Sequence, residues 1–149
     1  MAKSIKLDVP LVAQGLSMAC WYAAACMVSY YFRAGPRQGL PAKWTANKGI
    51  TPTDFIALAK VEGLVAMPTP PVGHDGGSLY TALRTYGPIW CAGFWYGPGH
   101  VIVLTGIDGN TVYLNDPDGG VEKTGTIPWF NVKVAKLPGA MMRKDPGRS

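Results

Sequence analysis

The stretch that decides the fold is ACWYAAACMVSYYF, residues 19–32, in which apolar side chains occupy almost every position. A helix that is apolar on all sides belongs inside a domain rather than on its surface. The run Ala34-Gly35-Pro36 follows, and a glycine followed by a proline is typical of the end of a helix. We therefore expect a central buried helix over about residues 19–32, preceded by a turn at residues 14–17.

Outward from this helix, the sequence predicts an α+β fold. Thr51 is the expected N-cap of a second helix that has Pro52 at its first position and ends at Gly63. A third helix is predicted from Ser78 to Gly87. After Pro88, short apolar runs separated by turn residues predict an antiparallel sheet, with strands at residues 89–95, 101–107, 111–114, 121–127 and 132–137.

Size and composition fit one folded unit. The chain has 149 residues, of which 48% are hydrophobic and 15% charged, so we expect a single domain over residues 1–149. The net charge of +5 is spread along the chain with no dense basic run, which argues against nucleic-acid binding. No stretch is apolar enough to predict membrane insertion. We expect a monomer.

The three cysteines do not suggest disulfides or a metal. They cannot all pair, and neither a CxxC motif nor closely spaced histidines are present, so we expect reduced thiols, no metal site and no cofactor. Cys20 stands where the turn meets the helix, and the positive end of a helix favours a reactive thiolate. The alternative is an inert buried cysteine, which is how we interpret Cys26 and Cys91.

His100 is the preferred partner for Cys20. It follows Tyr96-Gly97-Pro98-Gly99 and opens an apolar strand, which would fix its backbone and leave the ring free to act as a base. The alternative is an ordinary loop histidine. His74 competes for the role, but it lies in a glycine-rich stretch that would position a base poorly.

Two further elements complete the candidate site. Asn115 and Asp116 close the strand that pairs with the one His100 opens, so a hairpin would make them neighbours of His100 and able to orient its ring. They also fit an ordinary turn, because Pro117 and a glycine follow. Gln14, six residues before Cys20, is a candidate donor to a developing oxyanion.

Together these elements resemble the papain-like cysteine peptidases. The Gln-x5-Cys spacing and the Ala19-Cys20-Trp21 core match their nucleophile motif, although Ser17-Met18 replaces the Cys-Gly of the larger enzymes and the distance to His100 is shorter. The chain is most similar to a compact bacterial branch, the C39-like group and above all the AvrRpt2-like effector peptidases. Further matches are Val9-Pro10-Leu11-Val12, Cys20-Trp21-Tyr22-Ala23-Ala24, Gly87-Pro88-Ile89-Trp90, Gly99-His100 and Asn115-Asp116-Pro117.

The resemblance implies a papain-like fold in which the helix that carries the nucleophile packs on a C-terminal antiparallel sheet. It implies Cys20 as nucleophile, His100 as general base and acid, Asp116 as orienting residue and Gln14 as oxyanion donor. Asn115 is the alternative orienting residue, because papain itself uses an amide. Three aromatic residues are expected to bind substrate: Trp21, Trp95 and Tyr96.

The expected function is cleavage of peptide bonds in a polypeptide substrate. Because the resemblance is to effectors and residues 1–10 lack a Sec signal, we expect a bacterial effector or toxin, made in the cytoplasm and exported into a target cell by a specialised secretion system. A cognate inhibitor or immunity protein is a candidate partner. Two alternatives are an amidase toxin that cuts peptidoglycan stem peptides and a catalytically silent binding module.

Overall fold

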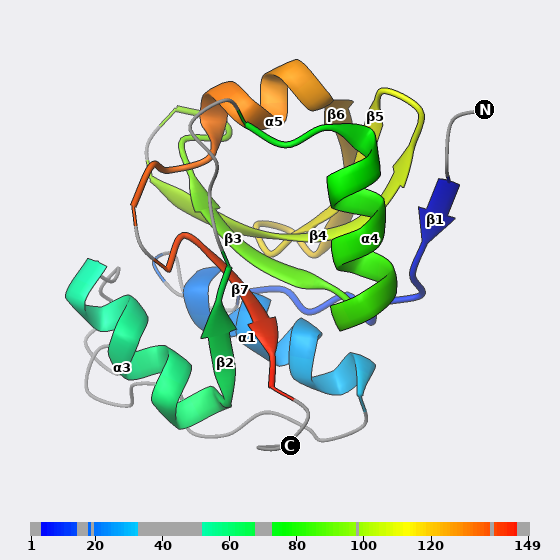
Figure 1. Cartoon of the computed structure of the whole chain (residues 1–149). Helices are drawn as coiled ribbons and strands as arrows, with labels where there is room; N and C mark the ends of the chain where they lie inside the picture. The colour runs from blue at the N-terminus through cyan, green and yellow to red at the C-terminus, as the bar shows by residue number, and fades with distance from the viewer. Residues whose placement is uncertain are drawn as a thin grey trace.

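The computed structural model describes residues 4–14, 18, 20–32, 52–67, 73–97, 99–137 and 139–145. Its centre is a seven-stranded antiparallel sheet in the order β2-β7-β3-β4-β5-β6, with β1 paired to β4 (Figure 1). The strands are β1 (Ser4–Lys6), β2 (Leu64–Ala66), β3 (Ile89–Gly93), β4 (His100–Asp108), β5 (Thr111–Asp116), β6 (Val121–Thr126) and β7 (Met141–Lys144). The helices are α1 (Cys20–Tyr31), α3 (Pro52–Glu62), α4 (Gly76–Tyr86) and α5 (Ile127–Lys133).

The two faces of the sheet carry separate cores, because side chains alternate along each strand. On one face, Trp90 and Val103 pack with residues of α1 and α3. On the other face, Cys91 and Ile102 pack with residues of α4 and α5. Helix α1 is therefore covered on one side by the sheet, and its residues 23–29 are all buried, as the run of apolar residues predicts.

Strand β4 is the centre of the sheet and positions the candidate site. Its first half pairs with β3, from His100 opposite Gly93 to Leu104 opposite Ile89. Its second half pairs with β1, and a Cβ added at Gly106 would lie 2.6 Å from the carbonyl oxygen of Ile5. Glycine is needed there because β1 approaches so closely. With β5 along its other edge, β4 has little freedom to move its first residue.

The antiparallel α+β architecture and the central buried helix are confirmed. Helix α3 begins at Pro52 and the turn at residues 109–110 joins β4 to β5, as predicted. Thr51, residues 15–17 and residues 34–36 lie outside the described part of the chain, so their predicted roles stay predictions. Within the described residues, no helix is long and apolar enough to span a bilayer.

Two expectations about secondary structure were wrong, and three short strands were missed. Of the predicted strand at 132–137, residues 132–133 end α5, Val134 makes an isolated β-bridge to Gly93, and residues 135–137 lie outside any helix or strand. Helix α5 starts after Thr126, whose side chain accepts a hydrogen bond from Trp129 N–H at 3.2 Å. This N-cap, with Pro128 in the first turn, outweighs the strand preference of Ile127 and Val132. Helix α4 begins at Gly76 rather than Ser78, because Asp75 forms a capping box with Ser78. The short strands β1, β2 and β7 were not predicted.

Candidate active site

The thiol of Cys20 lies at the first residue of α1 and is partly exposed. The other two thiols are buried. Burial raises the pKa of Cys26 to about 11. It raises the pKa of Cys91 still further, and that thiol donates to the carbonyl of Ile89 at 3.4 Å inside the core. Because the thiolate is the reactive form of cysteine, Cys20 is the thiol best placed for chemistry.

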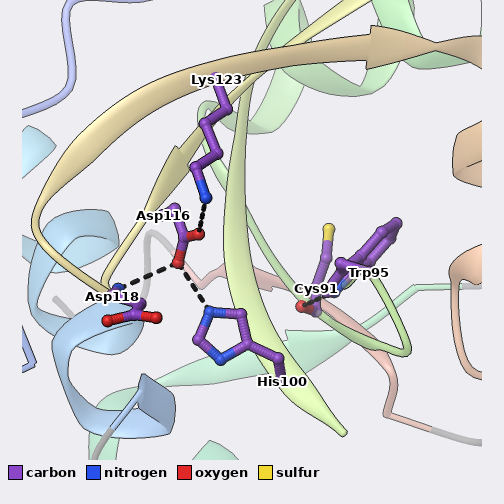
Figure 2. Close-up of polar contacts among 6 residues, drawn as sticks. All are labelled: Cys91, Trp95, His100, Asp116, Asp118 and Lys123. Atoms are coloured by element: carbon purple, nitrogen blue, oxygen red, sulfur yellow. Dashed lines mark hydrogen bonds and ion pairs between the residues drawn. The ribbon is translucent and has the colours of Figure 1, made fainter. Parts of the chain in front are cut away.

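His100 lies at the first position of β4, with 17% of its side chain exposed. Its Nε2 atom is 2.6 Å from Oδ1 of Asp116, which ends β5 (Figure 2). The β4–β5 pairing explains the contact, because Val103 opposite Asn115 sets a register that brings the two strand ends together. The sequence argument that a hairpin makes His100 and Asp116 neighbours is thus confirmed as geometry.

The carboxylate of Asp116 is almost completely buried and has three partners. Besides His100, Oδ1 accepts the backbone N–H of Asp118 at 2.9 Å, and Oδ2 lies 2.7 Å from Nζ of Lys123. Burial by itself raises the pKa of Asp116, but its hydrogen bonds to His100, Lys123 and Asp118 outweigh burial and lower it to about 2. Asp116 is therefore a stable carboxylate at neutral pH.

His100 also interacts with Cys20. Burial lowers the pKa of His100, but hydrogen bonds to Asp116 and to the Cys20 thiol outweigh that effect and raise the pKa from 6.5 to about 9. A histidine has two ring nitrogens. With Nε2 engaged by Asp116, Nδ1 is the nitrogen that remains for the sulfur. Thiol, imidazole and carboxylate thus form a chain of contacts drawn from α1, β4 and β5, which is the arrangement of an activated nucleophile with its base.

Gln14 lies beside this chain of contacts. Its backbone N–H donates to the carbonyl of Pro117 at 2.9 Å, next to Asp116 in sequence. The side-chain amide oxygen is shielded from solvent. The segment before α1 is therefore attached to the turn that follows β5.

The structure separates the alternatives that the sequence left open. Asn115 points its amide elsewhere, because Nδ2 donates to the carbonyl of Val9 at 3.2 Å on the α1 face of the sheet. His74 contacts a different region, where Nδ1 is 3.1 Å from Oγ of Ser78 and its backbone bonds Asn131. Asp116 is the residue in contact with His100.

Two of the three predicted substrate-binding aromatic residues need correction. Trp21 and Trp95 are each 1% exposed and belong to the two cores, so neither presents a surface to a substrate. The sequence places Trp21 next to Cys20 and Trp95 next to Tyr96, but it does not show that both side chains pack into the cores. Tyr96 is different, because it is 48% exposed and its ring centroid lies 6.4 Å from that of His100.

Lys123 is the residue that the sequence analysis missed. Its ammonium contacts Asp116 and also lies 4.2 Å from the centroid of the Tyr96 ring. The strand pairing could have indicated this contact. Val121 of β6 pairs with Asp116, and Lys123 lies two residues further along β6 on the same face of the sheet. As for metals, no group of three or more His, Cys, Asp or Glu side chains in the described part of the chain is arranged to hold an ion.

Comparison with known proteins agrees with this geometry. The sequence matches the profile of the family described as papain-like cysteine protease AvrRpt2 over residues 3–135. Among solved structures, a double glycine motif protease from an AMS/PCAT transporter, crystallised in complex with the leader peptide, shares the fold. It superposes with a TM-score of 0.55 and 18% identity over 93% of this chain and 91% of that chain. Since the family profile spans most of the sequence, the chain belongs to the AvrRpt2 family of papain-like cysteine proteases and is a cysteine peptidase.

Proposed function

We propose that the peptidase acts through Cys20 as nucleophile, His100 as general base and acid, Asp116 as orienting carboxylate and Gln14 as oxyanion donor. The observation that carries this proposal is the 2.6 Å contact of His100 Nε2 with the buried carboxylate of Asp116. That contact fixes the ring orientation, and the interaction with Cys20 puts a thiol beside the same ring.

The reaction begins with transfer of the thiol proton to His100, which leaves a thiolate beside an imidazolium. The Cys20 sulfur attacks the carbonyl carbon of the scissile peptide and forms a C–S bond, while the carbonyl oxygen takes the negative charge. The side-chain amide N–H of Gln14 and the backbone N–H of Cys20 donate to that oxyanion. When the intermediate collapses, the C–N bond breaks and the leaving amine takes the proton from His100.

The second half of the reaction releases the acyl group. His100, now neutral, takes a proton from water, whose oxygen attacks the thioester carbon. The C–S bond breaks, the product leaves as a carboxylic acid, and the cysteine is restored. Throughout, Asp116 stays ionised, because its low pKa keeps it a carboxylate, and it holds the ring in one tautomer.

These steps require a substrate with a peptide bond, and we propose that it is a polypeptide. The similar transporter protease was crystallised with a leader peptide, which supports a polypeptide substrate for this fold. We further propose that the chain is a bacterial effector or toxin that cuts a protein inside a recipient cell after export by a specialised secretion system. The membership of the AvrRpt2 family supports this role.

The catalytic assignment is tested by Cys20→Ala, with Cys26→Ala as the matched control. Both changes remove a thiol from α1, but only the first removes the one next to His100. We expect Cys20→Ala to abolish peptide cleavage and Cys26→Ala to keep it, with both proteins showing the native circular dichroism spectrum. Cleavage retained by folded Cys20→Ala would refute the assignment.

The biological role requires a different measurement. We expect mass spectrometry of a recipient-cell lysate to find new protein termini after incubation with the native chain and none with Cys20→Ala. A parallel incubation with purified murein separates the amidase alternative, because stem-peptide fragments there, without protein cleavage, would contradict the effector-protease proposal.

A further inference from the structure

Asp116 shares its charge between two cations. Oδ1 faces Nε2 of His100 at 2.6 Å, whereas Oδ2 faces Nζ of Lys123 at 2.7 Å (Figure 2). The carboxylate side chain is 1% exposed, so it has little water with which to complete its hydrogen bonding. A buried carboxylate of this kind is stable only when its partners supply charge and hydrogen bonds.

Lys123 is held on two sides. It comes from β6, where Val121 pairs with Asp116, so the position two residues along β6 lies diagonally across the same face of the sheet. Its ammonium lies over the ring of Tyr96, 4.2 Å from the centroid, in cation–π geometry. A lysine that contacts both a carboxylate and a ring has much less freedom than an ordinary surface lysine, although its side chain is 39% exposed.

We propose that Lys123 is a positioning residue for the catalytic pair: it holds the second oxygen of Asp116, so that the first oxygen alone faces His100, and it limits how strongly the carboxylate retains the imidazolium proton. This inference rests on the catalytic roles proposed above for His100 and Asp116. Lys123 does not touch the sulfur or the scissile bond in this scheme and acts only through Asp116.

The charges around the pair give the direction of the effect. Facing His100 and Asp116 are the Cys20 thiol from α1, Lys123 from β6, the Asp118 backbone N–H from the turn, and the Tyr96 hydroxyl, whereas the Asp118 carboxylate acts on Lys123. Among these partners, Lys123 is the one with a positive charge. Its positive charge disfavours a second positive charge on the His100 ring. It also partly neutralises the Asp116 carboxylate and so weakens the attraction of that carboxylate for the imidazolium.

The test is Lys123→Met, with Lys123→Arg as the matched control that keeps the charge. Nuclear magnetic resonance of the histidine rings follows protonation directly, and the chain has two histidines, so a His74→Gln spectrum assigns His100. We expect the titration midpoint of His100 to rise by about 0.5 to 1 pH unit in Lys123→Met. Lys123→Arg should stay near the native midpoint.

Activity gives the second readout. In Lys123→Met, the basic limb of the pH profile of kcat/KM should shift to higher pH together with the ring titration. In Lys123→Arg it should lie at the native pH. A merely structural lysine would not produce this shift. A midpoint that is unmoved or lower in folded Lys123→Met would overturn the proposal. If that variant does not fold, Lys123→Gln keeps a donor without the charge and is subject to the same criterion.

This design separates the two proposals. The ring titration needs no turnover, so it reports on Lys123 even if His100 proves not to be the base. Conversely, His100→Ala that retains cleavage would remove the catalytic assignment and leave the titration result standing. Tyr96→Leu, compared with Tyr96→Phe, should move the midpoint in the same direction as Lys123→Met by a smaller amount, because only the leucine removes the ring beneath the ammonium.

Discussion

Both histidines of the chain lie near an acidic residue, but the two acids differ in burial and in hydrogen bonding. His74 has Ser78 and Asp75 close by at the start of α4, where the hydroxyl and the carboxylate are exposed and cap the helix. His100 faces a single carboxylate that is buried and bound on both oxygens. A histidine near an acid is thus not informative by itself. What distinguishes the candidate active site is a carboxylate that contacts the ring directly and is almost fully shielded from water.

The comparison is tested most strongly by removing each ring in turn. We expect His100→Ala to lower kcat/KM by about 10³-fold or more, because the proposed base and acid of both half-reactions is lost. His74→Ala should stay within about twofold of the native value, since the hydrogen bonds of His74 to Asn131 are made by its backbone. Initial rates on a fluorogenic peptide measure both. Equal losses in the two folded variants would show that the environments do not differ in function.

The pH dependence of stability sharpens the same contrast. Because the pKa of His100 is raised from 6.5 to about 9, its protonated form stabilises the native state fully below pH 6.5, and that contribution is lost as the pH rises through 9. In a Cys20→Ala background, which removes the titration of that thiol, we expect the free energy of unfolding to fall by about 1 to 2 kcal/mol between pH 6 and pH 8, below the pH at which the buried thiols Cys26 and Cys91 ionise in the unfolded chain. Adding His100→Gln should abolish this fall. Urea denaturation at about pH 6 and pH 8 measures it, and a fall that persists would place its origin in another group.

Parts of the fold and the site were accessible to sequence reasoning because their signals are local. The apolar run of α1 and the turn between β4 and β5 each depend on a few consecutive residues. The neighbourhood of His100 and Asp116 follows from that hairpin alone, since antiparallel pairing joins the beginning of one strand to the end of the next. The geometry of the candidate pair could therefore be derived before any tertiary contact was known.

Other features depend on information that no short window contains. Lys123 reaches Asp116 only through the register of β6 on β5, and one residue of slip would point it to the opposite face. The burial of Trp95 requires the packing of α5, which was not predicted and whose two ends were assigned to strands because of their β-branched residues. Strands β2 and β7 pair with each other across a long separation and have too few residues for a visible alternation.

The smallest expected effect concerns the cap near His74. Oδ1 of Asp75 accepts the N–H of Ser78 at 2.7 Å, so Asp75→Ala leaves an N-terminal donor of α4 without its protein acceptor. We expect a loss of about 1 kcal/mol in the free energy of unfolding, which is typical for an N-cap. Peptide cleavage should be unchanged, because α4 packs on the face of the sheet opposite α1. Asp75→Asn is the matched control, since asparagine also caps helices and should recover most of the stability. If Asp75→Ala instead lowered turnover without lowering stability, the acid beside His74 would have a role in function, and the distinction between an exposed cap and the buried carboxylate of the candidate site would fail.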